Sequence, residues 1–345
     1  MKAAILTGKQ QITISDIPKP VPAQDEVLIK VEYCGICGSD VHAYETLMFP
    51  IGTILGHEFA GIIVEVGSGV TKNHVGDRVV VRPPGICDCE WCLKGELALC
   101  IQHFDNTVGL KIPGGFEDYV VVKDFQAIKL PDTISFQQAA QFEPLAVALH
   151  AVNNSGLNVG DTVVVFGAGP IGLLTMRGAK LAGAGKIYVV EKSPMRQAMA
   201  KKFGADCVFD PEAVDIIRSV LDLEPHGVNM IFECVGKQVT LDASLQLVHK
   251  GGQIIMLGAS AQPVTLDQLK WLQKGVTIRA SMGYFVEDFT AALKVTARGM
   301  YDLDSLVTDV IALDDLEEGI KRLRNPDQAL KILVRPEGNK EVDSV

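Results

Sequence analysis

Two short segments near the start of the chain combine side chains that bind transition metals. The first is GICGSDVH, which contains Cys37, Ser39 and His42, and the second is GHE, which contains His57 and Glu58. A thiolate and an imidazole are two of the three protein ligands that a catalytic zinc ion uses, while its fourth position stays open for water or substrate. We therefore interpret Cys37 and His57 as ligands of a catalytic metal.

A third protein ligand is still required, and the sequence offers a carboxylate for it. Glu143 lies in the segment QFEPL, and no cysteine occurs between residues 100 and 207. An unpaired charge in an apolar stretch costs free energy, and a zinc ion would offset that cost. Glu143 is thus the predicted third ligand.

Each of these residues also has a purely structural interpretation. Cys37 alone would be a buried thiol or would form a redox pair with Cys34, and His57 alone would be a hydrogen-bonded core histidine. The sequence around Cys34 lacks the strand and helix setting of a thioredoxin-like redox motif. The combination of three ligand types favours a metal site over these alternatives.

A second group of cysteines is confined to the segment 87–100. Four thiolates so close together in a cytosolic chain are typical of a closed, tetrahedral structural zinc site rather than of disulfides. A site with three cysteines, partly filled or empty, is the alternative. The four predicted ligands are Cys87, Cys89, Cys92 and Cys100.

A glycine-rich turn in the middle of the chain predicts a dinucleotide site. The segment GAGPIG fits the GxGxxG pattern between a strongly apolar strand and a helix, as the dinucleotide fingerprint requires. The glycines allow a close turn, and the free N–H groups at the start of the helix would face the pyrophosphate. A tight turn that binds nothing is the alternative. The predicted cofactor-binding residues of this turn are Gly167, Gly169, Pro170, Ile171 and Gly172.

An acidic residue ends the next predicted strand. Glu191 occurs at the position after the Gly167 turn where a carboxylate would accept hydrogen bonds from the adenosine ribose. Its negative charge would repel a 2′-phosphate, so NAD is favoured over NADP. Lys192 and Arg196 are nearby cations that weaken this preference for NAD. The alternative role of Arg196 is a position over the adenine.

The elements that must position these residues differ between the two halves of the chain. The first half, up to about residue 150, is rich in glycine, proline and short β-branched runs, such as 27–31, 61–66 and 78–81, which predicts a compact domain with a bent or barrel-like sheet. From about residue 152 apolar strands alternate with helices, which predicts a parallel sheet covered on both faces. The stretch after residue 283 reads as helical with a final strand at 331–334.

Composition excludes some partners. The net charge of −10 arises from 32 basic and 42 acidic residues, without a basic cluster, which argues against nucleic acid. No apolar run approaches the roughly 20 residues that span a bilayer, and the start of the chain does not fit a secretory signal. We expect a cytoplasmic protein that does not bind membranes.

In combination these motifs resemble the zinc-containing medium-chain alcohol and polyol dehydrogenase family, and the resemblance covers nearly the whole chain. They occur in the family order: GICGSD, GHE, the cysteine cluster, GGFEDYVVV, FEPLA and GAGPIG. The resemblance implies an α/β fold with a GroES-like β-rich catalytic domain, a Rossmann domain and a C-terminal segment that returns to the catalytic domain. The expected limits are 1–151, 152–283 and 284–345.

The resemblance also implies roles for single residues. Cys37, His57 and Glu143 would bind the catalytic zinc, and Glu58 would be an outer or transient ligand. Zinc would act as a Lewis acid that makes the substrate hydroxyl easier to deprotonate, and the hydride would pass to the nicotinamide. Ser39 and then His42 would carry the proton to solvent. The family spaces its cysteine ligands C-x2-C-x2-C-x7-C, whereas the first gap here is one residue.

Substrate and assembly are less strongly specified. A glutamate as third ligand is similar to the sorbitol, threonine and butanediol branch, so we expect a secondary alcohol, diol or sugar alcohol, with threonine-type oxidation as the alternative. Tyr44, Leu47, Phe49 and Pro50 are candidate pocket residues. Relatives form dimers or tetramers through the region that corresponds to 252–283. A zinc-free reductase of the superfamily and a non-catalytic protein that binds NAD and zinc are the competing interpretations.

Overall fold

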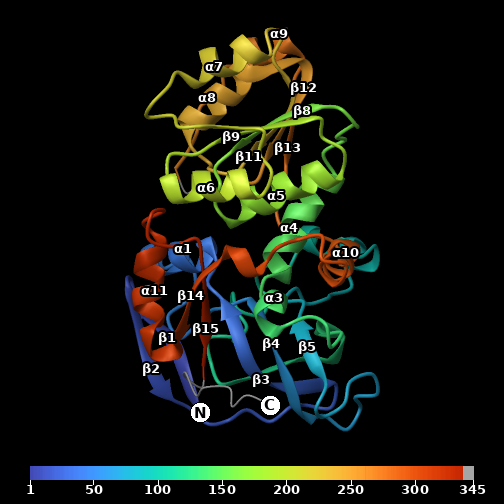
Figure 1. Ribbon diagram of the computed structural model, residues 1–345. Helices are drawn as coiled ribbons and strands as arrows, with labels where there is room; N and C mark the ends of the chain where they lie inside the picture. Colours follow the sequence, from blue (N-terminus) through green and yellow to red (C-terminus); the bar gives the residue numbers. More distant parts are fainter. Residues whose placement is uncertain (261, 337–345) are drawn as a thin grey trace. The chain divides into compact units, whose positions relative to one another are not determined.

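Two large sheets of different construction organise the described residues, each in its own unit (Figure 1). The computed structural model describes residues 1–260 and 262–336. The first unit comprises residues 1–143 together with the described residues from 285 onward, and the second comprises residues 144–284. The chain passes from the first unit to the second within helix α4 (Phe142–Asn153).

The first unit contains a mixed sheet in the order β14-β15-β3-β4-β5-β7, with β6 also paired to β3 and a separate β1-β2 hairpin. Its neighbours are antiparallel except for β14 and β15, which are parallel. The strands are β1 (Lys2–Gly8), β2 (Gln11–Asp16), β3 (Glu26–Gly35), β4 (Glu58–Val66), β5 (Arg78–Val81), β6 (Tyr119–Lys123), β7 (Ala127–Lys129), β14 (Val307–Ala312) and β15 (Lys331–Arg335).

Short helices connect these strands. Polar and small residues interrupt the β-branched runs, and most of the helices that form between the strands have only one or two turns. The α-helices are α1 (Gly38–Thr46), α2 (Glu90–Leu93), α3 (Phe136–Ala139), α10 (Val286–Ala297) and α11 (Leu316–Leu323), and the 3₁₀ helices are η1 (Leu97–Leu99), η2 (Asp124–Gln126), η3 (Asp304–Leu306) and η4 (Leu313–Asp315).

The second unit is built around a six-stranded parallel sheet in the order β10-β9-β8-β11-β12-β13. Numbered from β8, this is the order 3-2-1-4-5-6 of the Rossmann fold, which binds dinucleotides where the strand order reverses, here between β8 and β11. The elements are β8 (Thr162–Phe166), α5 (Pro170–Leu181), β9 (Lys186–Val190), α6 (Pro194–Lys202), β10 (Cys207–Phe209), α7 (Ile216–Leu223), β11 (Val228–Glu233), α8 (Gln238–Leu247), β12 (Val248–Met256), α9 (Gln268–Lys274) and β13 (Thr277–Ala280).

Helices cover both faces of this sheet, as the continuous apolar strands require. Figure 1 shows α7, α8 and α9 over one face and α5 and α6 over the other. The helix starts follow capping chemistry: the Ser193 side chain accepts a hydrogen bond from the Arg196 N–H at the start of α6, directly before Pro194. The predicted doubly wound parallel sheet is therefore confirmed.

One sequence expectation about the C-terminal stretch was wrong. It reads as helical up to a final strand, yet β14 (Val307–Ala312) lies within it and pairs with β15. The pattern VTDVIA has little alternation to distinguish a strand from a loop, and its pairing partner follows only after helix α11. Within the described residues, no helix is long and apolar enough to cross a membrane.

Candidate metal and cofactor sites

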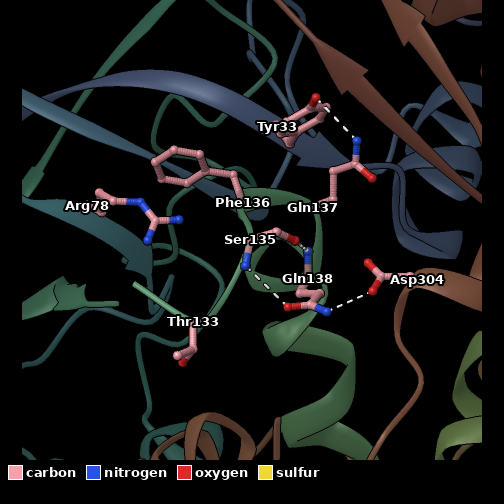
Figure 2. Close-up of a pocket in the computed structure, with 8 residues that line it drawn as sticks. All are labelled: Tyr33, Arg78, Thr133, Ser135, Phe136, Gln137, Gln138 and Asp304. Atoms are coloured by element: carbon pink, nitrogen blue, oxygen red, sulfur yellow. Dashed lines mark hydrogen bonds between the residues drawn. The ribbon is translucent and has the colours of Figure 1, made fainter. Parts of the chain in front are cut away.

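One surface cavity of the first unit has a volume of about 570 Å³ (Figure 2). Several of the side chains that line it form hydrogen bonds with one another. Gln137 donates to the Tyr33 hydroxyl at 3.3 Å, and Gln138 donates to Asp304 at 2.7 Å while also capping α3 together with Ser135. Its lining, among the described residues, contains none of the predicted site residues. We assign these side chains a structural role.

The two predicted metal-binding segments meet because β3 and β4 pair antiparallel. In that pairing Gly35 lies opposite Glu58, so the residues after β3 and before β4 lie at the same edge of the sheet. The candidate ligand atoms of Cys37, His57 and Glu58 all lie within 4.8 Å of one another. Two segments that are separate in the sequence thus form one cluster.

Helix α1 adds two polar side chains to this cluster. Cys37 is the N-cap of α1, and Ser39 Oγ lies 3.5 Å from His57 Nε2. Asp40 is 1% exposed; its Oδ2 accepts the Cys37 backbone N–H at 2.8 Å, and its Oδ1 lies 3.8 Å from His57 Nδ1. Within the described chain, neither Asp40 Oδ1 nor His57 Nδ1 has a hydrogen-bond partner. A carboxylate beside an imidazole in this way orients a metal-binding ring.

The charges around His57 favour a cation. Burial lowers the pKa of His57, but the Cys37 sulfur and the Asp40 carboxylate together raise it by more. The pKa of His57 therefore lies well above its ordinary value. An imidazole that would take up a proton so readily is surrounded by groups with negative charge. Sulfur, nitrogen and carboxylate donors together are the set that zinc binds in catalytic sites.

Glu143 lies on the first turn of α4, within reach of the charges of the same cluster. Burial raises the pKa of its carboxyl to about 7; His57 and Lys331 lower it, while Glu58 raises it. The mutually close ligand atoms include Glu58 rather than Glu143. The role of Glu143 as third ligand therefore stays a prediction.

Other predicted residues of α1 and the following loop are more dispersed. His42 is half-buried on α1, and its relay role stays a prediction. Tyr44 is 1% exposed, and its hydroxyl donates to Glu317 at 3.0 Å. Phe49 is buried in the same core, whereas Pro50 is exposed. Of these candidate pocket residues, Tyr44 and Phe49 thus pack in the core of the first unit.

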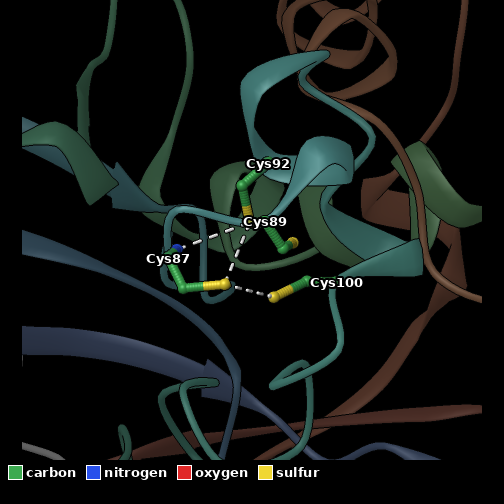
Figure 3. A group of neighbouring side chains, drawn as sticks. All are labelled: Cys87, Cys89, Cys92 and Cys100. Atoms are coloured by element: carbon green, nitrogen blue, oxygen red, sulfur yellow. Dashed lines mark hydrogen bonds between the residues drawn. The ribbon is translucent and has the colours of Figure 1, made fainter.

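The segment 87–100, called the cysteine lobe here, brings its four cysteine side chains close together (Figure 3). The sulfur of Cys87 lies 3.5 Å from that of Cys100 and 3.9 Å from that of Cys92, and all four sulfurs lie within 4.8 Å of one another. The shortened gap between Cys87 and Cys89 therefore does not keep Cys87 away from the others. Cys89 forms the N-cap of α2, which places Cys92 on the same short helix.

Backbone donors support this group of sulfurs. The Cys87 N–H points to the Cys92 sulfur at 3.4 Å, and the Gln102 N–H points to the Cys100 sulfur at 3.3 Å. The backbone N–H of Cys92 lowers the pKa of the Cys89 thiol to about 6, whereas burial raises the pKa of Cys100 to about 12. N–H groups aimed at sulfur stabilise thiolates, the form in which cysteine binds metal.

The glycine-rich turn of the second unit has the shape that a pyrophosphate requires. Gly167 has a φ of +87°, which favours glycine, and a Cβ on Gly172 would collide with the carbonyl oxygen of Gly167. Gly169 is the N-cap of α5, and Pro170 and Ile171 begin its first turn, half-buried. The helix therefore starts directly at the turn, where the first N–H groups of a helix have no carbonyl partner within it.

Glu191 lies beside this turn. It is 7% exposed; its Oε2 accepts the Ala168 N–H at 2.7 Å, and its Oε1 accepts the Ser193 N–H at 2.9 Å. The carboxylate is thus held against the turn that would bind the cofactor. The Arg196 guanidinium lies 3.6 Å from the position that a Cβ on Gly169 would occupy. Acidic and basic groups therefore flank the turn together.

Comparison with known proteins agrees with this geometry. Residues 23–132 match the family model of the alcohol dehydrogenase GroES-like domain, and residues 170–298 match that of the zinc-binding dehydrogenases. The (R,R)-butanediol dehydrogenase of Bacillus subtilis strain 168 is 37% identical over 97% of this chain and 100% of its own. The chain belongs to the zinc-binding medium-chain dehydrogenase family. Its first unit is the GroES-like domain of that family, and its second unit is the Rossmann-type domain.

Further relatives place this zinc-binding dehydrogenase among enzymes of several specificities. The sorbitol dehydrogenase of the same Bacillus strain is 32% identical over 97% of each chain. The solved structure of a putative zinc-binding dehydrogenase from Sinorhizobium meliloti 1021 bound to NADP is 33% identical, with a TM-score of 0.90 over 97% of this chain and 99% of that one. The family includes zinc-dependent NAD(P) alcohol and polyol dehydrogenases, and identities at this level leave the substrate open.

Two residues of this dehydrogenase's metal cluster were missed from the sequence. Asp40 lies within the GICGSD motif, three residues after Cys37, and this spacing is the signal that could have suggested its capping contact with the Cys37 N–H. Lys331 donates to the Glu58 carboxylate and is 2% exposed. Nothing in the segment KILVR distinguishes a buried cation from an ordinary lysine at a strand end, so only the structure reveals it.

Proposed function

We propose that this protein is a zinc-dependent oxidoreductase that transfers a hydride between NAD(H) and a secondary alcohol or polyol and its ketone. The observation that carries the proposal is the convergence of Cys37, His57 and a carboxylate at one sheet edge, in a chain whose second unit holds Glu191 against a glycine-rich turn. A metal that polarises an oxygen and a nicotinamide that accepts hydride are the two components that this reaction needs.

The residues at the metal cluster fit zinc. Cys37 supplies sulfur, His57 a nitrogen of its buried ring, and Glu143 or Glu58 a carboxylate oxygen. When bound there, zinc would supply Lewis-acid activation of the substrate oxygen. The four cysteines of the lobe would hold a second, structural zinc.

Proton transfer falls to residues of α1. The Ser39 hydroxyl lies next to the His57 ring, where it can accept a proton from the substrate hydroxyl and pass one on. His42, one turn further along α1, is the proposed next station toward solvent. Asp40 accepts the backbone N–H of Cys37 and faces His57, so it fixes the positions of these two residues relative to each other.

NAD is the proposed cofactor rather than NADP. The buried Glu191 carboxylate lies beside the turn, where a 2′-phosphate would meet its negative charge. Arg196, also beside the turn, is the group that would favour NADP, and one relative of similar fold holds NADP. Affinity for both cofactors measured side by side tests this choice.

Small diols and sugar alcohols are the proposed substrates. In support, the relatives include a butanediol dehydrogenase and a sorbitol dehydrogenase, one named for a diol and the other for a sugar alcohol. Threonine-type oxidation is the alternative within the same reaction class. A protein that binds NAD and zinc without catalysis is the alternative outside it.

We also propose a cytoplasmic homo-oligomer, a dimer or tetramer formed through residues 252–283. In support, β13 is an edge strand whose residues are all exposed, and the neighbouring α9 exposes Leu269 and Leu272. Unpaired strand edges and exposed leucines are features that proteins usually cover. Clustered thiols with metal-site geometry suit a reducing compartment.

The test is NAD reduction by a panel of diols, sugar alcohols and threonine, followed by NADH absorbance. Three preparations are compared: the purified protein, the same protein after a strong zinc chelator, and that protein after zinc is restored. We expect one secondary alcohol to be oxidised only by the first and third preparations. A protein that contains zinc at both sites and oxidises no member of the panel would favour the non-catalytic alternative.

A further inference from the structure

A buried lysine connects the two segments that carry the metal ligands. Lys331 is the first residue of β15 and is 2% exposed. Its ammonium group donates to the Ile36 carbonyl oxygen at 3.0 Å and to the Glu58 carboxylate. Ile36 directly precedes Cys37, and Glu58 directly follows His57. One cation therefore contacts both sides of the cluster.

The fold leaves space for this ion pair. A Cβ on Gly35 would collide with the Glu58 carboxylate and would lie 2.9 Å from Cε of Lys331. The absent side chain of Gly35, which lies opposite Glu58 in the β3-β4 pairing, thus provides the volume that the pair occupies. The ion pair belongs to the architecture of the sheet edge rather than to a flexible surface.

Glu58 is paired with one cation and lies within reach of the candidate position of another. Its carboxylate is among the candidate ligand atoms within 4.8 Å of Cys37 and His57, and it also forms the ion pair with Lys331. A carboxylate that is 1% exposed needs a counter-charge, and either cation would supply it. The metal and the lysine would compete for the same oxygens.

We propose that Lys331 holds the Glu58 carboxylate away from the metal and thereby keeps a coordination position free for substrate. Only the statement that substrate uses the free position rests on the proposed function. The competition between Lys331 and the metal for Glu58 concerns metal binding alone. Lys331 acts as a positioning residue: it contacts Glu58 and the segment before Cys37, not the reacting atoms. The prediction is that zinc gains a ligand when the ammonium is removed.

The test measures zinc release from Lys331→Met into an excess of a chromogenic chelator. We expect release from this site to slow at least about tenfold, because Glu58 then binds the metal, and turnover to fall because the free position is lost. Zinc should also raise the melting temperature of Lys331→Met more than that of the wild type. Release belonging to the cysteine lobe is identified as the phase that persists in His57→Ala.

Two further variants distinguish competition from a purely structural role. Glu58→Gln in the Lys331→Met background should return zinc release to the wild-type rate, since the extra ligand is gone, and Lys331→Arg should behave like the wild type. Lys331→Gln, which keeps a donor for the Ile36 carbonyl but no charge, gives a second measurement if Lys331→Met folds poorly. We expect slow release from it as well.

Faster or unchanged zinc release in both neutral variants, with no effect of Glu58→Gln, would overturn the proposal. The result is separable from the proposed function. Zinc release follows metal coordination whether or not NAD is reduced by any alcohol, so a protein without turnover can still support the competition. Conversely, turnover with an unchanged zinc release rate would leave the function standing and remove this inference.

Discussion

At the scale of single residues, a substitution of Asp40 is the best test of the proposed metal cluster. One of its oxygens holds the Cys37 N–H and the other faces His57. Asp40→Asn keeps the shape but removes the negative charge beside the imidazole. We expect zinc affinity to fall by about 10- to 100-fold, as for other partners of metal-binding histidines. Chelator competition measures this, and an affinity equal to that of the wild type would contradict it.

Glu117 is a buried acid outside the metal cluster. It is 2% exposed, and burial, with a smaller effect of the neighbouring Asp118, raises the pKa of its carboxyl to about 8. Because the pKa is higher in the folded than in the unfolded chain, the folded state binds the proton more tightly. Stability from this group is complete below the unfolded pKa and is lost as pH rises through about 8.

Glu117→Gln should therefore stabilise the protein increasingly as pH rises from the unfolded pKa of a glutamate to about 8, and fully above that. Each unit of pKa difference corresponds to about 1.4 kcal/mol, so the variant should unfold several degrees above the wild type at pH 9 and at a similar temperature at pH 5. Thermal unfolding followed by circular dichroism at the two pH values measures this. Glu65→Gln, at an exposed position on β4, is the matched control. Equal differences at both pH values would refute the expectation.

Residue types predicted the metal cluster better than they predicted its supports. Cys37 and His57 carry recognisable ligand chemistry, and the structure brings them together. Lys331 is remote from Glu58 in the sequence, so its contact depends on the pairing of β15 with β3, which no local pattern encodes. Whether Glu143 or Glu58 binds the metal depends on distances of a few ångströms, which sequence spacing does not specify.

At the scale of elements, the single-residue gap between Cys87 and Cys89 in the cysteine lobe leads to a testable prediction. The Cys87 sulfur lies with the other three, so we expect Cys87→Ser to lose one zinc per chain and to lower the melting temperature by about 5 °C or more. Zinc analysis and thermal unfolding measure both effects. Cys207→Ser, on β10 of the second unit, is the control and should keep its zinc. Full zinc content in Cys87→Ser would exclude Cys87 as a ligand.

The parallel strands of the second unit could be predicted closely because each is a short apolar run bounded by turn residues. The strands expected at 162–166, 186–190 and 207–209 occur at those limits as β8, β9 and β10. The edge strand β13 could not be predicted in this way. All residues of its sequence, TIRA, are exposed, so it lacks the buried apolar pattern by which the other strands are recognised.

At the scale of the whole molecule, the oligomeric state tests whether the exposed edge of the second unit is a subunit interface. Leu269 and Leu272 are 64% and 70% exposed on α9. If residues 252–283 form a subunit interface, Leu269→Asp with Leu272→Asp should reduce the molar mass measured by light scattering after gel filtration. Val159→Asp, which alters an exposed valine of the same unit, should leave the mass unchanged. A wild type that is already monomeric would contradict the proposed oligomer.

The order of the motifs along the chain predicted the division into a metal-binding part and a dinucleotide-binding part. Substrate identity was not predictable, because it depends on side chains of segments such as 44–50, where the structure buries Tyr44 and Phe49 and exposes Pro50. Similarity over nearly the whole chain extends to relatives named as butanediol and as sorbitol dehydrogenases, so it does not separate these substrates.

The most direct test of the central claim follows the transferred hydrogen. The zinc-loaded protein is incubated with NAD and with an alcohol that reduces NAD in the substrate panel, labelled with deuterium at the carbon that bears the hydroxyl. We expect NADH with a single deuterium, formed with zinc present and absent after chelation, because hydride leaves that carbon directly for the nicotinamide. NADH without deuterium, or the same labelled product from protein shown to lack zinc at Cys37 and His57, would contradict the account.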